Sequence, residues 1–86
     1  MNHRVLIDIE CLDALPKSGK RRDAVLSFCS NLAYTLYDAS DFQIRQPETM
    51  RVVEVSIRHG FSITWWIDAP VQRVVVIDIR KYEKES

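Results

Sequence analysis

The N-terminal segment carries the hydrophobic pattern of a strand followed by a short helix. Val5, Ile7 and Ile9 alternate with mostly polar neighbours over residues 4–10, and this two-residue period predicts a half-buried strand. The amphipathic residues that come next end at Pro16. Because proline cannot continue a helix, they predict only one or two helical turns.

A second, longer helix is predicted from about Ser18, its candidate N-cap, to about Tyr37. Its apolar residues recur at steps of three and four and form one broad face, as in a helix that packs on a core. These residues are Val25, Phe28, Cys29, Leu32, Ala33 and Leu36. Residues 38–50 are the least patterned, with a short extended piece at 42–45, and they predict a loop that is either mobile or functional.

The alternation of apolar and polar residues returns in the C-terminal part of the chain. It predicts strands over residues 51–58, 61–67 and 71–80, with tight turns at His59-Gly60 and at residues 68–70. Three sequential strands joined by short turns are typical of an antiparallel meander. The N-terminal strand is expected to pair with a strand that is not its neighbour in sequence, because alone it would leave both edges unpaired.

We expect one face of this sheet to be apolar and to be covered by the helices. Its predicted members are Val5, Ile7, Ile9, Val53, Val55, Ile57, Ile63, Trp65, Ile67, Val75, Ile77 and Ile79. The predicted members of the opposite face are Glu54, Ser56, Arg58, Ser62, Thr64, Trp66, Asp68, Val74, Val76, Asp78 and Arg80.

These elements predict one α+β domain over residues 1–86. In it, a two-helix hairpin packs on one face of an antiparallel four-stranded sheet, in the order β-α-α-β-β-β. The composition, 47% hydrophobic and 28% charged, is that of an ordinary globular domain.

The cysteines, the termini and the apolar runs bear on location and cofactors. Cys11 and Cys29 are interpreted as reduced core residues of a cytoplasmic protein, because no secretory signal is visible. No apolar run approaches the ~20 residues of a membrane span. Neither cysteines nor histidines have metal-ligand spacing, so we expect no metal and no cofactor.

The twelve basic and twelve acidic side chains cancel to a formal net charge of zero. This balance argues against a protein held on nucleic acid by bulk electrostatics, but it leaves room for a local basic patch. Lys20, Arg21 and Arg22 crowd the first turn of the long helix, where the macrodipole disfavours cations. Either these charged side chains are simply solvated at the start of the helix, or they have a functional role.

The face predicted to lie away from the helices is where we expect function. Trp66 stands there among polar residues, covered by a loop or the C-terminal tail, or else exposed to a protein partner or a stacked base. Arg58 and Arg80 are expected on the same face, where Asp78 and Glu54 could pair with them.

Spacing alone identifies no catalytic motif. Chemistry on RNA would therefore need arginine or lysine to hold the scissile phosphate, and tyrosine, histidine or arginine to transfer a proton. The candidates in the right region are Arg51, Arg58, His59, Arg80, Lys81 and Tyr82.

The order of elements, with residues 12–17 between the first strand and the long helix, resembles the RelE/ParE superfamily of toxins from bacterial toxin–antitoxin modules. The run from Met50 to Trp66 continues the resemblance, with Arg51 entering a strand and Gly60 in the hairpin. A hydrophobic last strand over 74–81 ends in basic residues, as in the family.

The resemblance implies a toxin that binds a cognate antitoxin, with a role in plasmid stabilisation. It would inhibit translation as a metal-independent mRNA interferase at the ribosome, or poison a protein target such as gyrase. The implied catalytic residues are Arg58, Arg80 and Tyr82, and the implied RNA- or partner-binding residues are Arg51, Trp66 and Lys81.

Three positions depart from the RNA-cleaving members. Ser62 stands where they carry an arginine, and Glu54 and Ser56 stand where they carry basic residues. These departures favour a protein target or a member without toxicity. A different class of function is therefore kept as the alternative: a non-catalytic, non-toxic interaction module, for example a homodimer.

Overall fold

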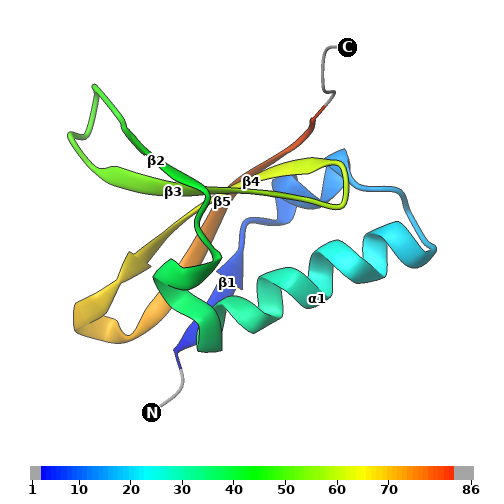
Figure 1. Cartoon of the computed structure of the whole chain (residues 1–86), viewed down its shortest axis with the longest axis horizontal. Coiled ribbons are helices and arrows are strands. Elements are labelled where there is room, and N and C mark those ends of the chain that lie inside the picture. Colours follow the sequence, from blue (N-terminus) through cyan, green and yellow to red (C-terminus); the bar gives the residue numbers. More distant parts are fainter. Residues whose placement is uncertain (1–2, 83–86) are drawn as a thin grey trace.

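The computed structural model describes residues 3–82 and is shown in Figure 1. One helical layer lies against one face of a twisted sheet, and the other face carries no helix (Figure 1). The helices are η1 (Ile9–Ala14), α1 (Lys20–Thr35), η2 (Leu36–Ala39) and η3 (Ala69–Val71). The strands are β1 (Arg4–Ile7), β2 (Phe42–Arg45), β3 (Val52–Arg58), β4 (Phe61–Asp68) and β5 (Arg73–Lys81).

The sheet has five strands in the order β1-β5-β4-β3-β2. The predicted meander is confirmed as β3, β4 and β5, and β1 pairs with a strand distant in sequence, as expected. The predicted antiparallel four-stranded sheet is wrong in two respects. β1 runs parallel to β5, and β2 adds a fifth strand antiparallel to β3.

The predicted two-helix hairpin is also wrong, because within residues 3–82 only α1 is an α-helix. The segment before Pro16 forms the six-residue 3₁₀ helix η1, capped by the Asp8 carboxylate, which accepts the Glu10 N–H at 3.1 Å. So short a segment cannot repay the cost of nucleating an α-helix on its own. The N-cap of α1 is Gly19 and not Ser18, and no side chain caps that end.

The β3–β4 hairpin decides which side chains share a face. Its turn is His59-Gly60, with φ values of 55° and 83°, the two positive angles of a type I′ turn. A two-residue turn pairs each residue of β3 with a β4 residue of opposite parity, so Arg58 lies opposite Phe61 and Ser56 opposite Ile63. The prediction that odd-numbered residues face the helix is therefore confirmed for β4, with Ile63 and Trp65 in the core, and wrong for β3.

An irregularity in β5 changes the facing residues a second time. Trp65 pairs with Val76 although Thr64 pairs with Asp78, so Ile77 is an extra residue that opposes no partner in β4. Beyond such a bulge, the odd- and even-numbered residues of the strand exchange faces of the sheet. The helix side therefore receives Val74 and Val76 before the bulge and Ile79 after it, where the pattern predicted Val75, Ile77 and Ile79.

The core lies between α1 and the sheet. It contains Cys11, Leu15, Val25, Cys29, Leu32, Ala39, Phe61, Ile63, Trp65, Val74, Val76 and Ile79. The predicted apolar stripe of α1 is confirmed, because its buried residues belong to this core and Phe28 and Leu36 pack against it. Ile9, in contrast, is 78% exposed on η1. Among residues 3–82, no helix is long and apolar enough to cross a membrane.

Candidate functional site

A groove of about 410 Å³ lies on the face of the sheet that carries no helix, and we call it the open-face groove. Four neighbouring strands, β2 to β5, and the residue after β2 build its walls. Its lining residues are Ile44, Gln46, Val53, Thr64, Ile77, Asp78 and Arg80. Val53 is fully buried, whereas Ile44 is half-exposed, so the groove combines an apolar floor with a polar rim.

Arg80 supplies the cation at the rim of the groove. Its Nε lies 2.7 Å from Oδ2 of Asp78, and its side chain is 79% exposed. An exposed pair of this kind contributes at most about 1 kcal/mol, since water screens both charges. A carboxylate or phosphate of a ligand could therefore replace Asp78 at little cost.

Arg51 and Trp66 form a second pair on the same face. The Arg51 guanidinium carbon lies 3.9 Å from the centroid of the Trp66 ring, a cation–π contact. The indole is half-buried and not enclosed under α1, which agrees with its predicted place on the face away from the helix. Because Arg51 is exposed, a ligand in this region would meet a stacked cation and aromatic ring.

The predicted grouping of Arg58 with Arg80 is wrong, because Arg58 lies on the helix side. Its NH1 donates to Asp41 Oδ2 at 2.6 Å and its NH2 donates to the Ala39 carbonyl at 3.2 Å. Its guanidinium also lies over the Phe28 ring, 5.2 Å from the centroid. The opposite parity of the two hairpin strands causes this placement, and it ties Arg58 to the corner between η2 and β2.

Asp41 is the acid that this corner depends on, and the sequence pattern did not single it out. Its Oδ2 accepts the Ile57 N–H at 2.7 Å and the Arg58 guanidinium. The Ile57 N–H, first, and then Arg58 hold the pKa of Asp41 below its ordinary value.

Glu54 and Ser56, predicted to face away from the helix, are buried on the helix side. The Ser56 hydroxyl donates to the Ala39 carbonyl at 2.6 Å and accepts the Trp65 indole N–H at 3.0 Å. Glu54 pairs with no arginine, and both of its carboxylate oxygens accept from Gln43 Nε2. These residues support the sheet and do not line the open-face groove.

The remaining candidates cluster near the β3–β4 turn. The Tyr82 N–H donates to the Gly60 carbonyl at 2.9 Å, and Lys81 is the register partner of Phe61. His59, Lys81 and Tyr82 are all exposed. They lie around the C-terminal end of β5, where Lys81 directly follows Arg80 in the sequence.

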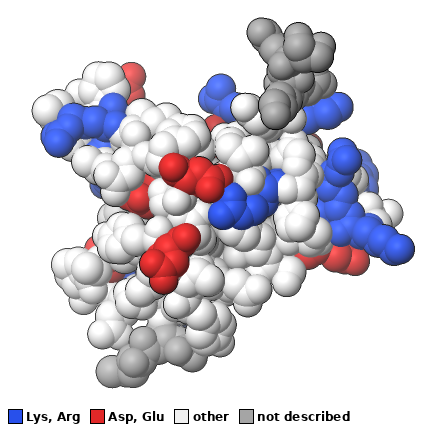
Figure 2. Space-filling view, viewed as in Figure 1, with Lys and Arg blue, Asp and Glu red and all other residues white. Residues whose placement is uncertain are grey.

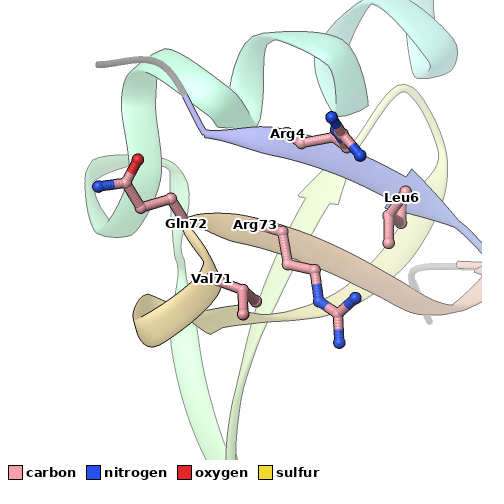
Figure 3. Close-up of a pocket in the computed structure, with 5 residues that line it drawn as sticks. All are labelled: Arg4, Leu6, Val71, Gln72 and Arg73. Carbon is pink, nitrogen blue, oxygen red and sulfur yellow. The ribbon is translucent and has the colours of Figure 1, made fainter.

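A second depression, of about 340 Å³, opens beside the edge strand β1. Arg4, Leu6, Val71, Gln72 and Arg73 line it, and Figure 3 shows the guanidinium groups of Arg4 and Arg73 pointing away from one another. Arg73 is paired with Asp68 at 3.2 Å. The two arginines therefore do not converge on one anion.

The two thiols are buried and free. Burial, followed by the nearby thiol of Cys11, raises the pKa of Cys29 to about 11. Burial and then the acidic groups of Asp8, Asp78 and Glu10 raise the pKa of Cys11. Both thiols are therefore protonated near neutral pH, as expected of core residues and not of nucleophiles. Within residues 3–82, no three histidine, cysteine or acidic side chains group as metal ligands would.

No protein-family model matches the sequence, and no curated protein matches it. The structure is similar to a chain in the crystal structure of the toxin–antitoxin complex RelBE2 from Mycobacterium tuberculosis, with a TM-score of 0.75 and 16% sequence identity. The superposition covers 94% of this chain and 99% of that chain. The chain therefore has a RelE-like α+β fold, and the resemblance to the RelE/ParE superfamily is confirmed for the fold.

Proposed function

We propose that this chain is the toxin component of a toxin–antitoxin module and that a cognate antitoxin neutralises it. One observation carries the proposal: nearly the whole chain superposes on nearly the whole of a chain from a toxin–antitoxin complex. The superposition covers 94% of this chain and 99% of that chain, so the two share their fold almost from end to end.

The working surface in this proposal is the open-face groove together with Arg51 and Trp66. The apolar floor, with Ile44 and Val53, suits side chains of a protein partner, and the weakly paired Arg80 suits an acidic group on that partner. In the neutralised state, an extended or helical antitoxin segment covers this surface and excludes the target.

For the toxic action, we favour non-catalytic inhibition of a protein target. The supporting observation is Arg58, whose guanidinium is engaged by Asp41 and the Ala39 carbonyl on the other side of the sheet. Only Arg80 among the three implied catalytic residues lines the groove. The groove therefore offers a bound phosphate one cation, already neutralised in part by Asp78.

The second candidate is metal-independent cleavage of mRNA. It is favoured by the sequence Arg80-Lys81-Tyr82, which puts two cations and a phenol in succession at the exposed end of β5. In this version Arg80 holds the scissile phosphate and Tyr82 transfers the proton.

Controlled expression of the intact chain in a bacterium tests the proposal. We expect growth arrest that is relieved when the product of the adjacent small gene is expressed with it, and a stable complex of the two proteins on size-exclusion chromatography. Harmless expression at a verified level of folded protein would refute the toxin assignment. A self-associated, inert product would favour the interaction module instead.

Mapping new mRNA 5′ ends during translation separates the two actions. Non-catalytic inhibition predicts no new ends, whereas cleavage predicts ends that disappear in Arg80→Ala. The matched control is Arg73→Ala, since Arg73 is also paired with an acid on the open side but lies outside the groove. Loss of growth inhibition in Arg80→Ala but not in Arg73→Ala would assign the groove to the toxic action.

A further inference from the structure

The strand β2 forms one edge of the sheet and pairs on one side only, with β3. Its two apolar side chains, Phe42 and Ile44, are each 48% exposed. Edge strands present unpaired N–H and C=O groups, and many carry a lysine or a proline that blocks further pairing, whereas β2 contains neither. In Figure 2, the part of the molecule where Figure 1 places β2 and β3 is mostly white, with both blue and red atoms on it. This edge is therefore open to another strand.

The backbone of β2 directs hydrogen-bonding groups away from the sheet at two residues. The Gln46 N–H, directly after β2, donates to the Arg51 carbonyl at 2.8 Å. In an antiparallel pair, alternate residues point their N–H and C=O groups toward the partner strand. The groups of Ile44 therefore point toward β3 like those of Gln46. Those of Gln43 and Arg45 point outward, where a further strand would bind.

Both ends of this edge are closed, which limits the length of a strand that can be added. Before β2, the Asp41 carboxylate accepts the Ile57 N–H at 2.7 Å and so occupies the place where a strand would pair with the rest of β3. After β2, Pro47 has no N–H to donate. A strand as short as β2 itself fits the edge between these limits, whereas a long extended segment would run past them.

The sequence of this edge is complementary to itself. When two copies of β2 pair antiparallel about Gln43, each Gln43 faces its counterpart, and the two residues can exchange backbone hydrogen bonds. Phe42 then faces Ile44 of the second copy, and Asp41 faces its Arg45. A two-fold interface brings the same surface together twice, so each of these contacts occurs in duplicate. Apolar side chains thus meet apolar ones, and each carboxylate meets a guanidinium.

The charged side chains are available for this pairing. Arg45 takes part in none of the three ion pairs found within residues 3–82. The Asp41 side chain is 38% exposed, and the bonds that it makes to the described residues, including the ion pair with Arg58, use Oδ2. Its Oδ1 is therefore left for a second cation.

The apolar side of β2 connects this edge with the open-face groove. Gln43 bonds to Glu54 on the helix side, so Phe42 and Ile44, its neighbours in sequence, project on the opposite side. Ile44 already lines the groove. We propose that a second copy of this chain pairs with β2 in the register centred on Gln43, and that its Phe42 extends the wall of the groove beside Ile44. The inference goes beyond the toxin proposal, because it makes a second copy part of the site.

Sedimentation velocity of the full chain, from about 1 μM to about 1 mM, tests this proposal. The chain has a mass of 10.0 kDa, and we expect the average mass to rise toward that of a dimer as the concentration increases. The contact is short, as in weak complexes with small interfaces, so we expect a dissociation constant on the order of micromolar or above. A monomer at every concentration would overturn the proposal and leave the edge to a strand of a different protein.

The substitution Arg45→Glu tests the predicted charge contact. It places a carboxylate opposite Asp41 twice in the dimer, and we expect at least about tenfold weaker association, because two attractive contacts become repulsive. The matched control is Arg4→Glu, the same change at an exposed arginine in β1, the strand at the other edge of the sheet. It should associate within about twofold of the unmodified chain. Equal losses in the two variants would overturn the proposal.

Cysteine cross-linking tests the register. In Gln43→Cys, the two introduced residues face one another with their Cα atoms about 5.5 Å apart, within the reach of a disulfide. In Arg45→Cys, they lie roughly 13 Å apart along the strands and cannot be bridged. The native thiols are buried, so mild oxidation should produce a covalent dimer of Gln43→Cys only. Cross-linking of Arg45→Cys, or none in Gln43→Cys that is folded by circular dichroism, would overturn this register.

The outcome is independent of the toxin proposal. A chain that arrests growth but stays monomeric refutes only the pairing of β2. A chain that dimerises through β2 but leaves growth unaffected refutes only the toxin assignment.

Discussion

At the scale of single residues, Ser56 is a polar side chain that has become part of the core. It is fully buried, and its hydroxyl links the Trp65 indole N–H to the Ala39 carbonyl. Through these two bonds, β3 holds both the centre of β4 and the end of η2. A buried donor and a buried acceptor depend on this one side chain.

Replacing Ser56 with alanine is therefore expected to destabilise the chain by about 1–3 kcal/mol, because the Trp65 N–H loses its acceptor and the Ala39 carbonyl loses a donor. Urea denaturation followed by tryptophan fluorescence measures the change. Ser62→Ala is the control, since Ser62 is in β4 on the open side, and it should shift the free energy of unfolding by less than about 0.5 kcal/mol. Similar effects of the two substitutions would contradict the assigned role of Ser56.

The carboxylate of Asp41 makes the stability of the folded chain depend on pH. Its pKa is lower in the folded chain than its ordinary value of 3.8, chiefly because of the Ile57 N–H and then of Arg58. The unfolded chain therefore binds a proton at Asp41 more readily than the folded chain does. The stability that Asp41 contributes is present above the unfolded pKa and is lost as the pH falls through the folded pKa.

We expect Asp41→Asn to be less stable than the unmodified chain at neutral pH, and the difference to shrink below about pH 4. Urea midpoints measured across this range test the prediction. Arg58→Gln should retain much of the pH dependence, because it leaves the Ile57 N–H, the larger cause, in place. A difference between Asp41→Asn and the unmodified chain that stays constant from neutral to acidic pH would rule out this linkage.

At the scale of elements, the β3–β4 hairpin organises the sheet. Both turn residues have positive φ, which glycine adopts freely and histidine adopts at some cost. The turn length then determines that Arg58 and Ser56 face the helix while Val53 and Val55 face the open side. One two-residue turn thus separates the buried network from the open-face groove.

Gly60→Ala is expected to cost roughly 1 kcal/mol of stability, because a Cβ disfavours this left-handed conformation. The space itself is sufficient, since the nearest atom, Cζ of Arg21, would be 3.8 Å away. His59→Asn is the control and should be neutral or slightly stabilising, because Asn-Gly is the preferred type I′ pair. Thermal unfolding of the two variants tests this, and an unchanged melting temperature in Gly60→Ala would contradict it.

At the scale of the whole molecule, one face of the sheet packs against α1 and the other carries the open-face groove. β2 and β3 extend the sheet beyond α1 (Figure 1), and both strands contribute residues to the open-face groove. A partner bound in this groove would therefore approach from the side of the sheet opposite α1.

The sequence by itself determined the local elements, because their signals involve neighbouring residues. The periods of two and of 3.6 located the meander and α1, and His59-Gly60 identified the hairpin. The apolar stripe of α1 and the core role of both cysteines also followed from the pattern. At this level the family resemblance indicated the fold correctly.

Only the tertiary structure decided which side chains share a face. Because of the turn length, even-numbered residues of β3 share a face with odd-numbered residues of β4. The bulge at Ile77 then makes odd- and even-numbered residues exchange faces within β5. Arg58 was thereby separated from Arg80, while Ile44 and Val53 joined the groove. The two-residue period of a strand shows that its side chains alternate between the two faces of the sheet, but not which set faces the core. That choice depends on the hydrogen-bond register with the other strands, and the register is set only when the sheet assembles.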